Sequence, residues 1–364
     1  MNDFKQKILM TISIISLLWQ FQIAAQSDSL LQDEIEWEAF PIFNYDSDAG
    51  YGYGGKGFLY NFLGGRESFD LILYNSTKGE RWYRFVISLP DIQRRHGKKY
   101  PVALDLITDY DKWINYKYYS KGYNYLTDKV KDEAISYKRE VIELTALLSK
   151  GFVKDFVAEF GLRFKSSNSF GFNPLNNGFD YNGINDLTTH VQVASLIFNF
   201  RWDTRTNYIN PQNGFVLEID NEIARDILNP PAQNFYKIGI LSQQYINLVV
   251  PNFVFANRIM FQAISDVNYQ FQIPLGGKNI LRGLPQDRYL STSSVLINSE
   301  LRFPIWWRFG GIAGVDIGNS ESTPDWIINP VIGLRLYMDN FIVRFDVGFG
   351  KETTGIYFNF GHMF

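Results

Sequence analysis

The sequence contains no cysteine and only three histidines. The absence of cysteine excludes a disulfide framework, thiolate catalysis, cysteine-ligated zinc and a lipid anchor on an N-terminal cysteine. His96, His190 and His362 lie far apart, without the spacing of metal ligands on a helix, and no G-x-S-x-G nucleophile motif occurs. His190 and Ser195 are five positions apart, which on a strand places them on opposite faces. We therefore predict no enzymatic activity and no metal or cofactor site.

An excess of one charge sign is also missing. The chain has 35 Lys and Arg against 38 Asp and Glu, a formal net charge of -3, so no broad basic field indicates nucleic-acid binding. Gly52, Gly54 and Gly57 match the dinucleotide pattern G-x-G-x-x-G, but the segment continues without the helical period that phosphate binding requires. We interpret it as a curled strand in which glycine relieves crowding.

Long apolar runs are absent after residue 26, where no stretch of about 18 apolar residues occurs and the mean hydropathy of the chain is -0.16. The one long apolar run, residues 8–23, follows Lys5 and Lys7 and precedes Ala24-Ala25. This order is typical of a secretory signal peptide at residues 1–25, and a single membrane anchor is the alternative. We expect residues 26–35 to form a short periplasmic leader and residues 36–364 to form the folded domain.

Aromatic residues, at 17% of the sequence, and 29 glycines are a composition typical of β-structure with many turns. In residues 341–349 the odd positions are all apolar, whereas the even positions include Arg344 and Asp346. Similar alternation places Glu300 and Asp316 on the polar faces of two further predicted strands. A soluble β-sandwich would show the same pattern, but the aromatic character of the apolar faces favours a barrel that meets lipid.

Alternation and turn residues together delimit about sixteen strands, an even number as in bacterial single-chain barrels. The predicted strands are residues 36–46, 51–62, 67–77, 80–90, 98–109, 133–149, 152–166, 187–202, 213–225, 234–249, 252–267, 292–304, 307–318, 328–338, 341–350 and 354–364. The long connections, 110–132, 167–186 and 268–291, are predicted to be extracellular loops. Because proline cannot donate to a sheet ladder, Pro41 indicates that the first strand is an edge.

Several short motifs in the second half of the chain occur in a characteristic order. They are Asp203-Thr204-Arg205, Asn210-Pro211-Gln212-Asn213-Gly214-Phe215, Leu275-Gly276-Gly277, Arg282-Gly283-Leu284, Glu300-Leu301-Arg302-Phe303-Pro304 and Val315-Asp316-Ile317-Gly318. In this order they resemble the motifs of the BamA/TamA-type outer-membrane assembly superfamily, also described as the bacterial surface antigen barrel domain. The resemblance runs from about residue 200 to residue 364 and extends more weakly back to about residue 40.

The resemblance implies an all-β fold: a transmembrane antiparallel barrel of sixteen strands whose sixth extracellular loop is folded inward. It implies a loop lock, in which Arg282 and Gly283 hold that loop to Glu300 and Asp316. It also implies a turn motif and a C-terminal assembly signal. The turn motif comprises Asp203, Arg205, Pro211 and Gly214, and the assembly signal comprises Phe358, Phe360 and Phe364.

The sequence departs from the family pattern at three points. Leu284 stands where an aromatic residue is usual, and His362 stands where an aromatic residue is common in the C-terminal signal. The best-known members carry periplasmic POTRA domains that receive client chains, and residues 26–36 are too few to encode one. We therefore expect a member without POTRA domains.

The resemblance also implies a function and a location. We expect a protein of the Gram-negative outer membrane that takes part in membrane-protein insertion, assembly or translocation, by opening a weakly paired seam between its first and last strands. Expected partners are the lipid bilayer, unfolded outer-membrane client proteins and periplasmic or lipoprotein accessory factors, with no nucleic acid. The alternative is a plugged channel or structural scaffold of the outer membrane without insertase activity.

Overall fold

The computed structural model describes residues 34–95, 97–119, 135–173, 190–205, 207–228, 234–250, 252–265, 267–338 and 341–364. The predicted signal peptide, most of the predicted leader and His96 lie outside these ranges. Among the described residues, no helix is long and apolar enough to cross a membrane.

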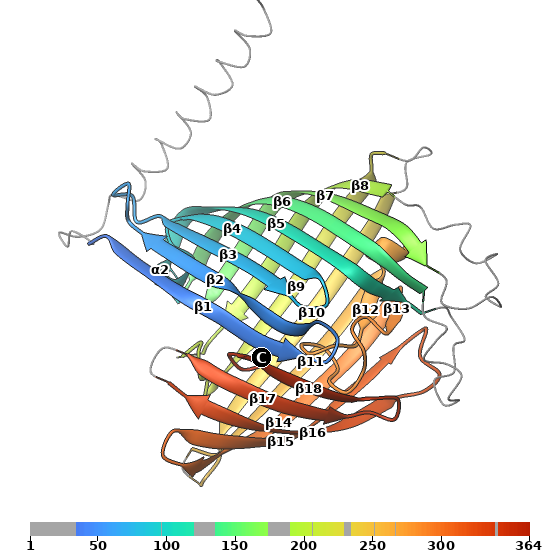
Figure 1. Ribbon diagram of the computed structural model, residues 1–364. Helices are drawn as coiled ribbons and strands as arrows, with labels where there is room; N and C mark the ends of the chain where they lie inside the picture. Colours follow the sequence, from blue (N-terminus) through green and yellow to red (C-terminus); the bar gives the residue numbers. More distant parts are fainter. Residues whose placement is uncertain are drawn as a thin grey trace, which may run out of the picture.

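Within the described ranges, sixteen antiparallel strands form one closed barrel, and the first strand pairs with the last (Figure 1). In barrel order along the chain they are β1 (Glu36–Asp46), β2 (Gly50–Tyr60), β3 (Ser68–Ser76), β4 (Glu80–Leu89), β5 (Tyr100–Tyr118), β6 (Ile135–Val153), β7 (Phe156–Asn173), β8 (His190–Asp203), β9 (Gly214–Asp226), β10 (Asn234–Asn247), β11 (Val254–Ile264), β14 (Ser293–Trp306), β15 (Phe309–Ser320), β16 (Ile327–Tyr337), β17 (Ile342–Phe349) and β18 (Thr354–Phe360). A one-turn helix, α2 (Ile92–Arg95), lies between β4 and β5. The predicted all-β fold, an antiparallel barrel of sixteen strands, is confirmed.

Two of the predicted connections partly belong to strands of the barrel. β5 continues to Tyr118 and β7 to Asn173, although residues 110–132 and 167–186 were predicted to be loops. The sequence from 110 to 118 carries polar residues on both faces, so it lacks the alternation by which a half-buried strand is found. Gly52, Gly54 and Gly57 lie inside β2, which is followed by a turn rather than a helix, as the curled-strand interpretation requires.

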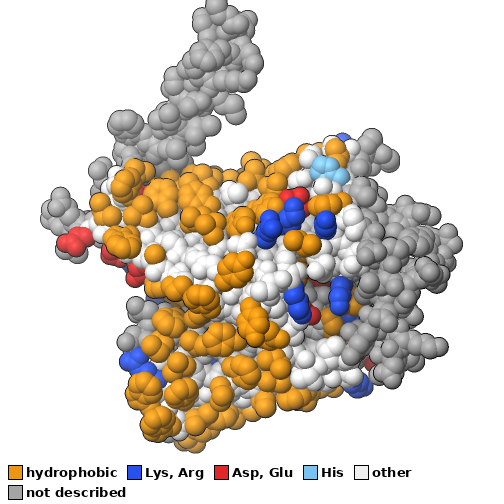
Figure 2. All heavy atoms as spheres, viewed as in Figure 1, with side chains coloured by type: hydrophobic (Ala, Val, Ile, Leu, Met, Phe, Trp, Pro, Cys, Tyr) orange, Lys and Arg blue, Asp and Glu red, His pale blue; other side chains and the backbone are white. Residues whose placement is uncertain are grey.

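Alternation along the strands separates a buried polar face from an exposed apolar face. On β17, Arg344 and Asp346 are 1% and 0% exposed, whereas Phe345 between them is 40% exposed. On β16, Arg335 is buried and its neighbour Leu334 is exposed. Hydrophobic side chains consequently cover much of the outer face seen in Figure 2. The buried polar face lines the interior of the closed barrel.

The barrel is tall on one side and short on the other (Figure 1). The strands β5, β6 and β7 have 19, 19 and 18 residues, whereas β17 and β18 have 8 and 7. The short strands lie next to the junction at which the barrel closes.

Candidate functional site

The described residues between β11 and β14 hold the motif that the sequence singles out. They include a 3-10 turn, η3 (Tyr269–Phe271), and two short paired strands, β12 (Ile273–Leu275) and β13 (Tyr289–Ser291). Gly276, Gly277 and Gly283 have φ angles of 134°, 94° and 88°. Residues other than glycine rarely adopt such values. The Gly277 N–H donates to the Leu284 carbonyl at 3.2 Å. The glycines thus fold the chain back on itself around Arg282. We call residues 265–292 the connecting segment.

Arg282 is completely buried and contacts carboxylates on three barrel strands. Its Nε and Nη2 donate to Asp316 Oδ2 and Oδ1 at 2.8 and 2.9 Å. Its Nη1 donates to Glu300 Oε1 at 2.8 Å and to Asp346 Oδ2 at 2.9 Å. The two-point contact with Asp316 fixes the orientation of the guanidinium as well as its charge. The backbone N–H of Arg282 donates to Asp316 Oδ2 as well, at 3.0 Å.

This contact is fully buried and strongly charged. Burial alone would lower the pKa of Arg282, but Asp316 and Glu300 outweigh burial and raise this pKa well above its ordinary value. The side chains of Arg282, Glu300, Asp316 and Asp346 are all 0% exposed. Removing the arginine would leave the buried carboxylate of Asp316 without an ion-pair partner, which is much more costly than losing a surface ion pair.

Asp346 is the member of this cluster that sequence reasoning missed. Alternation along β17 places Asp346 on the polar face, which lines the barrel interior. It does not predict that Asp346 touches Arg282, because the two are far apart in sequence and no spacing rule joins a loop to a strand. The available signal was the order of the motifs, in which Asp346 follows Glu300 and Asp316 on a later strand.

Glycines in the barrel wall let the backbone of the connecting segment come close. A Cβ at Gly348 of β17 would lie 2.6 Å from the backbone carbon of Arg282 and 2.7 Å from the nitrogen of Gly283. The Gly283 N–H donates to the hydroxyl of Tyr357 on β18 at 3.1 Å, and the Gly283 carbonyl accepts from Thr353 Oγ1 at 2.8 Å. The predicted pair Arg282-Gly283 is therefore held by backbone as well as by charge.

A second group of contacts holds the residues that follow the motif. Arg288 Nε donates to Glu352 Oε2 at 2.8 Å. Asp287 accepts a hydrogen bond from the Tyr116 hydroxyl of β5 and lies 3.7 Å from Arg139 Nη1 of β6. These contacts reach the tall side of the barrel, and no motif in the sequence predicted them.

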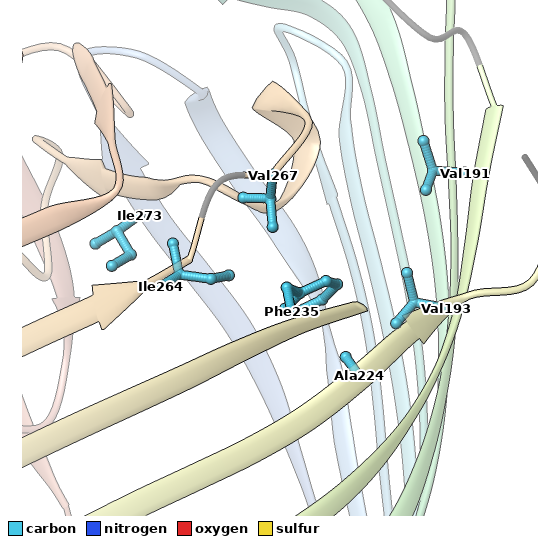
Figure 3. Close-up of a cluster of buried hydrophobic side chains, with 7 residues drawn as sticks. All are labelled: Val191, Val193, Ala224, Phe235, Ile264, Val267 and Ile273. Atoms are coloured by element: carbon cyan, nitrogen blue, oxygen red, sulfur yellow. The ribbon is translucent and has the colours of Figure 1, made fainter. Parts of the chain in front are cut away.

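Apolar side chains hold the start of the connecting segment (Figure 3). Val267 and Ile273 of the segment belong to one cluster with residues of β8, β9, β10 and β11. Those residues are Val191, Val193, Ala224, Phe235 and Ile264. The segment is therefore anchored at this end by burial of apolar surface, which does not depend on the charged cluster.

The turn motif lies between β8 and β9, and Asn210 Oδ1 of this connection lies 3.2 Å from His362 Nε2. Asp203 accepts hydrogen bonds from Arg205, from its Nε at 3.0 Å, its Nη2 at 2.7 Å and its backbone N–H at 3.1 Å. Thr204 Oγ1 accepts from the Phe215 N–H at 2.9 Å, next to Gly214 with its φ of 113°. Pro211 is buried in the same connection. Since the contacts of Asp203 and Thr204 are local, they shape the turn itself.

The three residues of the C-terminal assembly signal do not all lie on one strand. β18 ends at Phe360, Gly361 turns the chain with a φ of 78°, and Phe364 is 8% exposed. The Phe364 ring lies under two guanidiniums, with Arg258 Cζ at 5.2 Å and Arg302 Cζ at 5.3 Å. Arg302 Nη2 also donates to the Phe364 backbone oxygen at 2.8 Å. Cation–π contact and burial explain why this residue lies inside rather than on the outer face.

The junction between the first and last strands is weakly paired. β1 and β18 share two paired positions, Tyr45 with Phe358 and Asp46 with Tyr357, whereas β1 and β2 share eleven. Residues 36–44 of β1 consequently have no β18 partner within the described chain. We call this junction the seam. Pro41 lies in its unpaired part, in agreement with the expected edge position.

The connecting segment bridges the seam at its paired end. On one side, Lys278 Nζ lies 3.2 Å from Asp46 Oδ2, and the Gln286 N–H donates to Asp48 Oδ2 at 2.9 Å. On the other side, Gly283 contacts Tyr357 as described above. The seam is thus tied at one end and free along the remainder of β1.

Comparison with known proteins places this barrel and its motifs in a family. The Omp85 superfamily domain matches residues 61–364, so the chain belongs to the Omp85 superfamily. This confirms the resemblance identified from the motifs. Among curated proteins, none is similar enough in sequence to count as a match. A sixteen-strand barrel of this superfamily is consistent with a location in the outer membrane.

Three solved structures illustrate the shared fold. "BamA from Haemophilus ducreyi lacking POTRA domains 1-3" matches with a TM-score of 0.62 at 15% identity, over 90% of this chain and 70% of that one. CdiB from Escherichia coli matches with a TM-score of 0.60 at 13% identity, over 93% of this chain and 68% of that one. CdiB from Acinetobacter baumannii matches with a TM-score of 0.58 at 13% identity, over 92% of this chain and 60% of that one. This chain therefore spans less than two thirds of the last of these structures.

Proposed function

We propose that this barrel inserts or assembles client proteins in the outer membrane, and that the client strand enters at the seam. The observation that supports the proposal is the pairing of β1, which has eleven partners on β2 and two on β18. The free N–H and C=O groups of a strand edge are a template for a further strand. Members of the superfamily work in general with outer-membrane clients and accessory factors, and the proposal assigns such partners to this chain.

In this mechanism the client adds an extended strand to residues 36–44 of β1. Main-chain hydrogen bonds provide the affinity, so clients of different sequence can bind. The short strands β17 and β18 face β1 across the seam and separate from it with few bonds to break. New strands then add to the client until it closes and leaves.

We further propose that the connecting segment is the sixth extracellular loop, folded into the barrel, and that Arg282 and Gly283 lock it there. The lock joins the segment to β14, β15 and β17, and Lys278 joins it to β1. When the seam opens along residues 36–44, the segment keeps the two sides together at the paired end. It would act as a hinge that limits how far the barrel opens.

The direct test is the folding rate of an unfolded client barrel into liposomes that contain this protein. Wild type should accelerate folding relative to empty liposomes. A Phe43→Cys/Phe360→Cys variant should lose the acceleration when oxidised and regain it when reduced, because continuing the register from Tyr45–Phe358 places these positions opposite each other. The native chain has no cysteine, so the introduced pair is unique.

The matched control is Val343→Cys/Phe360→Cys. It uses the same Phe360 substitution but links β17 to β18, which are paired at these positions. Oxidation of this control should leave the acceleration intact. An oxidised seam variant as active as its reduced form would overturn the seam mechanism.

The second candidate function is a plugged channel or structural scaffold. The observation that favours it is the number of independent anchors on the connecting segment, which hold it by charge, backbone contact and apolar packing. Its signature would be no acceleration of client folding by wild type, together with ion conductance in planar bilayers that appears only when Arg282→Ala releases the segment.

A further inference from the structure

Five buried arginines gather on one wall of the barrel interior. They are Arg258 on β11, Arg282 on the connecting segment, Arg302 on β14, Arg335 on β16 and Arg344 on β17, each no more than 8% exposed. The carboxylates within ion-pair distance of this group are Glu300, Asp316 and Asp346. Five positive charges thus face three side-chain carboxylates within this cluster of described residues. Arg302 also contacts the main-chain oxygen of Phe364, the last residue of the sequence, which contributes at most one further negative charge. At least one positive charge is therefore in excess. An uncompensated buried charge is strongly unfavourable.

The lock accounts for Arg282 but leaves donors on three other arginines unused. Arg302 Nη1, Arg335 Nη2, and both Nε and Nη1 of Arg344 are buried and have no hydrogen-bond partner among the described residues. Arg335 Nη2 is 3.7 Å from Glu300 Oε1, and Arg344 Nε is 3.6 Å from Asp346 Oδ2, both too long for hydrogen bonds. Buried donors are nearly always satisfied in native proteins, so four in one place require an explanation.

Shared carboxylates bring the three side chains together. Arg302 and Arg335 both lie beside Glu300, and Arg335 and Arg344 both lie beside Asp346. Arg335 Nε is 3.4 Å from His362 Nδ1. Burial, followed by the charges of Arg302, Arg335 and Arg344, lowers the pKa of His362 well below its ordinary value. The imidazole is therefore neutral and adds no further positive charge to the cluster. The three arginines lie close enough together to act on one ligand.

We propose that Arg302, Arg335 and Arg344 form a binding site for a small oxyanion, a phosphate or carboxylate group, inside the barrel. The planar fork of a guanidinium matches the oxygens of either group. An oxyanion would bring negative charge to the cluster, and its oxygens would accept the unused N–H groups of the three arginines. The site adjoins Glu300 and Asp346, which also bind Arg282, so the bound oxyanion stabilises the same wall that holds the connecting segment.

The test is a titration of the purified barrel in detergent with sodium phosphate, sodium acetate or sodium chloride at constant ionic strength. A ligand that binds only the folded state raises the midpoint of heat unfolding in a saturable way. We expect a rise of several degrees with phosphate and none with chloride. A response to acetate as well would identify the carboxylate group as a ligand, and its absence would assign the site to phosphate.

Arg344→Gln is the diagnostic variant. Arg344 makes one hydrogen bond among the described residues, from Nη2 to Asn279 Oδ1 at 3.1 Å, and it carries two of the four unused donors. The variant removes an uncompensated charge, so it should fold in the absence of phosphate and lose the phosphate response. Arg163→Gln is the matched control, because Arg163 is an inward arginine of β7 paired with Glu143 and Glu222. It should respond like wild type.

Two results would overturn the proposal. One is a midpoint that responds to chloride as strongly as to phosphate, and the other is an Arg344→Gln variant that responds as wild type does. If Arg344→Gln fails to fold, calorimetric titration of wild type with phosphate decides the question, since an absence of saturable heat contradicts the site. Arg344→Lys, which keeps the charge but not the fork, should then bind phosphate more weakly than wild type.

Discussion

Gly283 of the connecting segment and Gly348 of β17 meet backbone to backbone. A Cβ at Gly283 would lie 2.9 Å from the Gly348 carbonyl oxygen, and a Cβ at Gly348 would lie 2.7 Å from the Gly283 nitrogen. Both distances are shorter than real Cβ contacts, so each position requires glycine for the sake of the other. Position 283 requires glycine for a second reason, because its φ of 88° is a left-handed conformation.

Gly348→Ala should push the connecting segment away from β17. The added methyl meets backbone rather than a flexible side chain, so we expect a loss of about 1–3 kcal/mol in the free energy of unfolding and faster proteolysis of residues 276–288. Gly57→Ala is the control, since a Cβ there meets nothing within 4 Å. Equal heat resistance and equal protease protection of the two variants would contradict the close approach.

Arg282→Ala should destabilise the barrel by about 3–5 kcal/mol, because it leaves buried carboxylates without their partner. Asp316 should account for most of this loss, since Glu300 retains Arg302 and Asp346 retains Arg335 as ion-pair partners. The double variant Arg282→Ala/Asp316→Asn should therefore be more stable than Arg282→Ala alone. A double-mutant cycle on heat unfolding measures this coupling, and additive effects of the two substitutions would refute it.

Asp48 should make the stability depend on pH. Burial and the neighbouring charge of Asp46 raise the pKa of Asp48 from 3.8 to about 6, against the opposing effects of the Gln286 N–H, Lys117 and Lys78. Between about pH 6 and pH 4 the folded state therefore binds a proton at Asp48 that the unfolded chain does not bind. The ionised Asp48 destabilises the folded state above about pH 6. Protonation of Asp48 removes this cost as the pH falls toward 4, so the free energy of unfolding rises in that range.

The measurement is the heat-unfolding midpoint of wild type and Asp48→Asn at pH 7 and at pH 5. The variant keeps an acceptor for the Gln286 N–H but cannot titrate. The advantage of Asp48→Asn over wild type should be larger at pH 7 than at pH 5. A constant difference between the two proteins would mean that Asp48 titrates in its ordinary range.

The seam should be visible by amide hydrogen exchange. Residues 36–44 of β1 have partners on one side, whereas β9 is paired on both sides with β8 and β10. We expect peptides from β1 to exchange roughly tenfold faster or more than peptides from β9, because fewer bonds need to open. Equal protection of the two strands in lipid would indicate that the seam is closed.

The sequence predicted the barrel well because one physical constraint acts on every strand. Each strand that spans a membrane has an apolar face toward lipid and a polar face inward, so a period of two repeats along the chain. The prediction of strand bounds was wrong for strand segments that extend beyond the region where this constraint acts. The extensions of β5 to Tyr118 and of β7 to Asn173 have no continuous apolar face, so alternation did not separate them from loops.

The site was predictable only in part, for a related reason. The motif order indicated Arg282, Glu300 and Asp316, which the structure brings together. The contacts of Asp287 with Tyr116 and of Arg288 with Glu352 depend on how the connecting segment crosses the barrel. The inward turn of Phe364 depends on a single glycine and on two arginines of other strands. Such contacts follow from the tertiary arrangement and leave no local pattern.

The glycines at 318, 348 and 350 have a consequence for how this protein evolves. A Cβ at each would meet Leu281 and Leu275, Arg282 or Gly283, respectively, so the connecting segment occupies the space in which side chains of the wall would otherwise lie. Wall and segment therefore form one packing unit although they are distant in sequence. Substitutions in the wall and in the connecting segment should therefore occur together. A larger residue in the wall is tolerated only if the facing residue of the segment is smaller or displaced. Correlated variation among homologues should map onto these contacts more strongly than onto the lipid-facing surface, where residues have no specific protein partner.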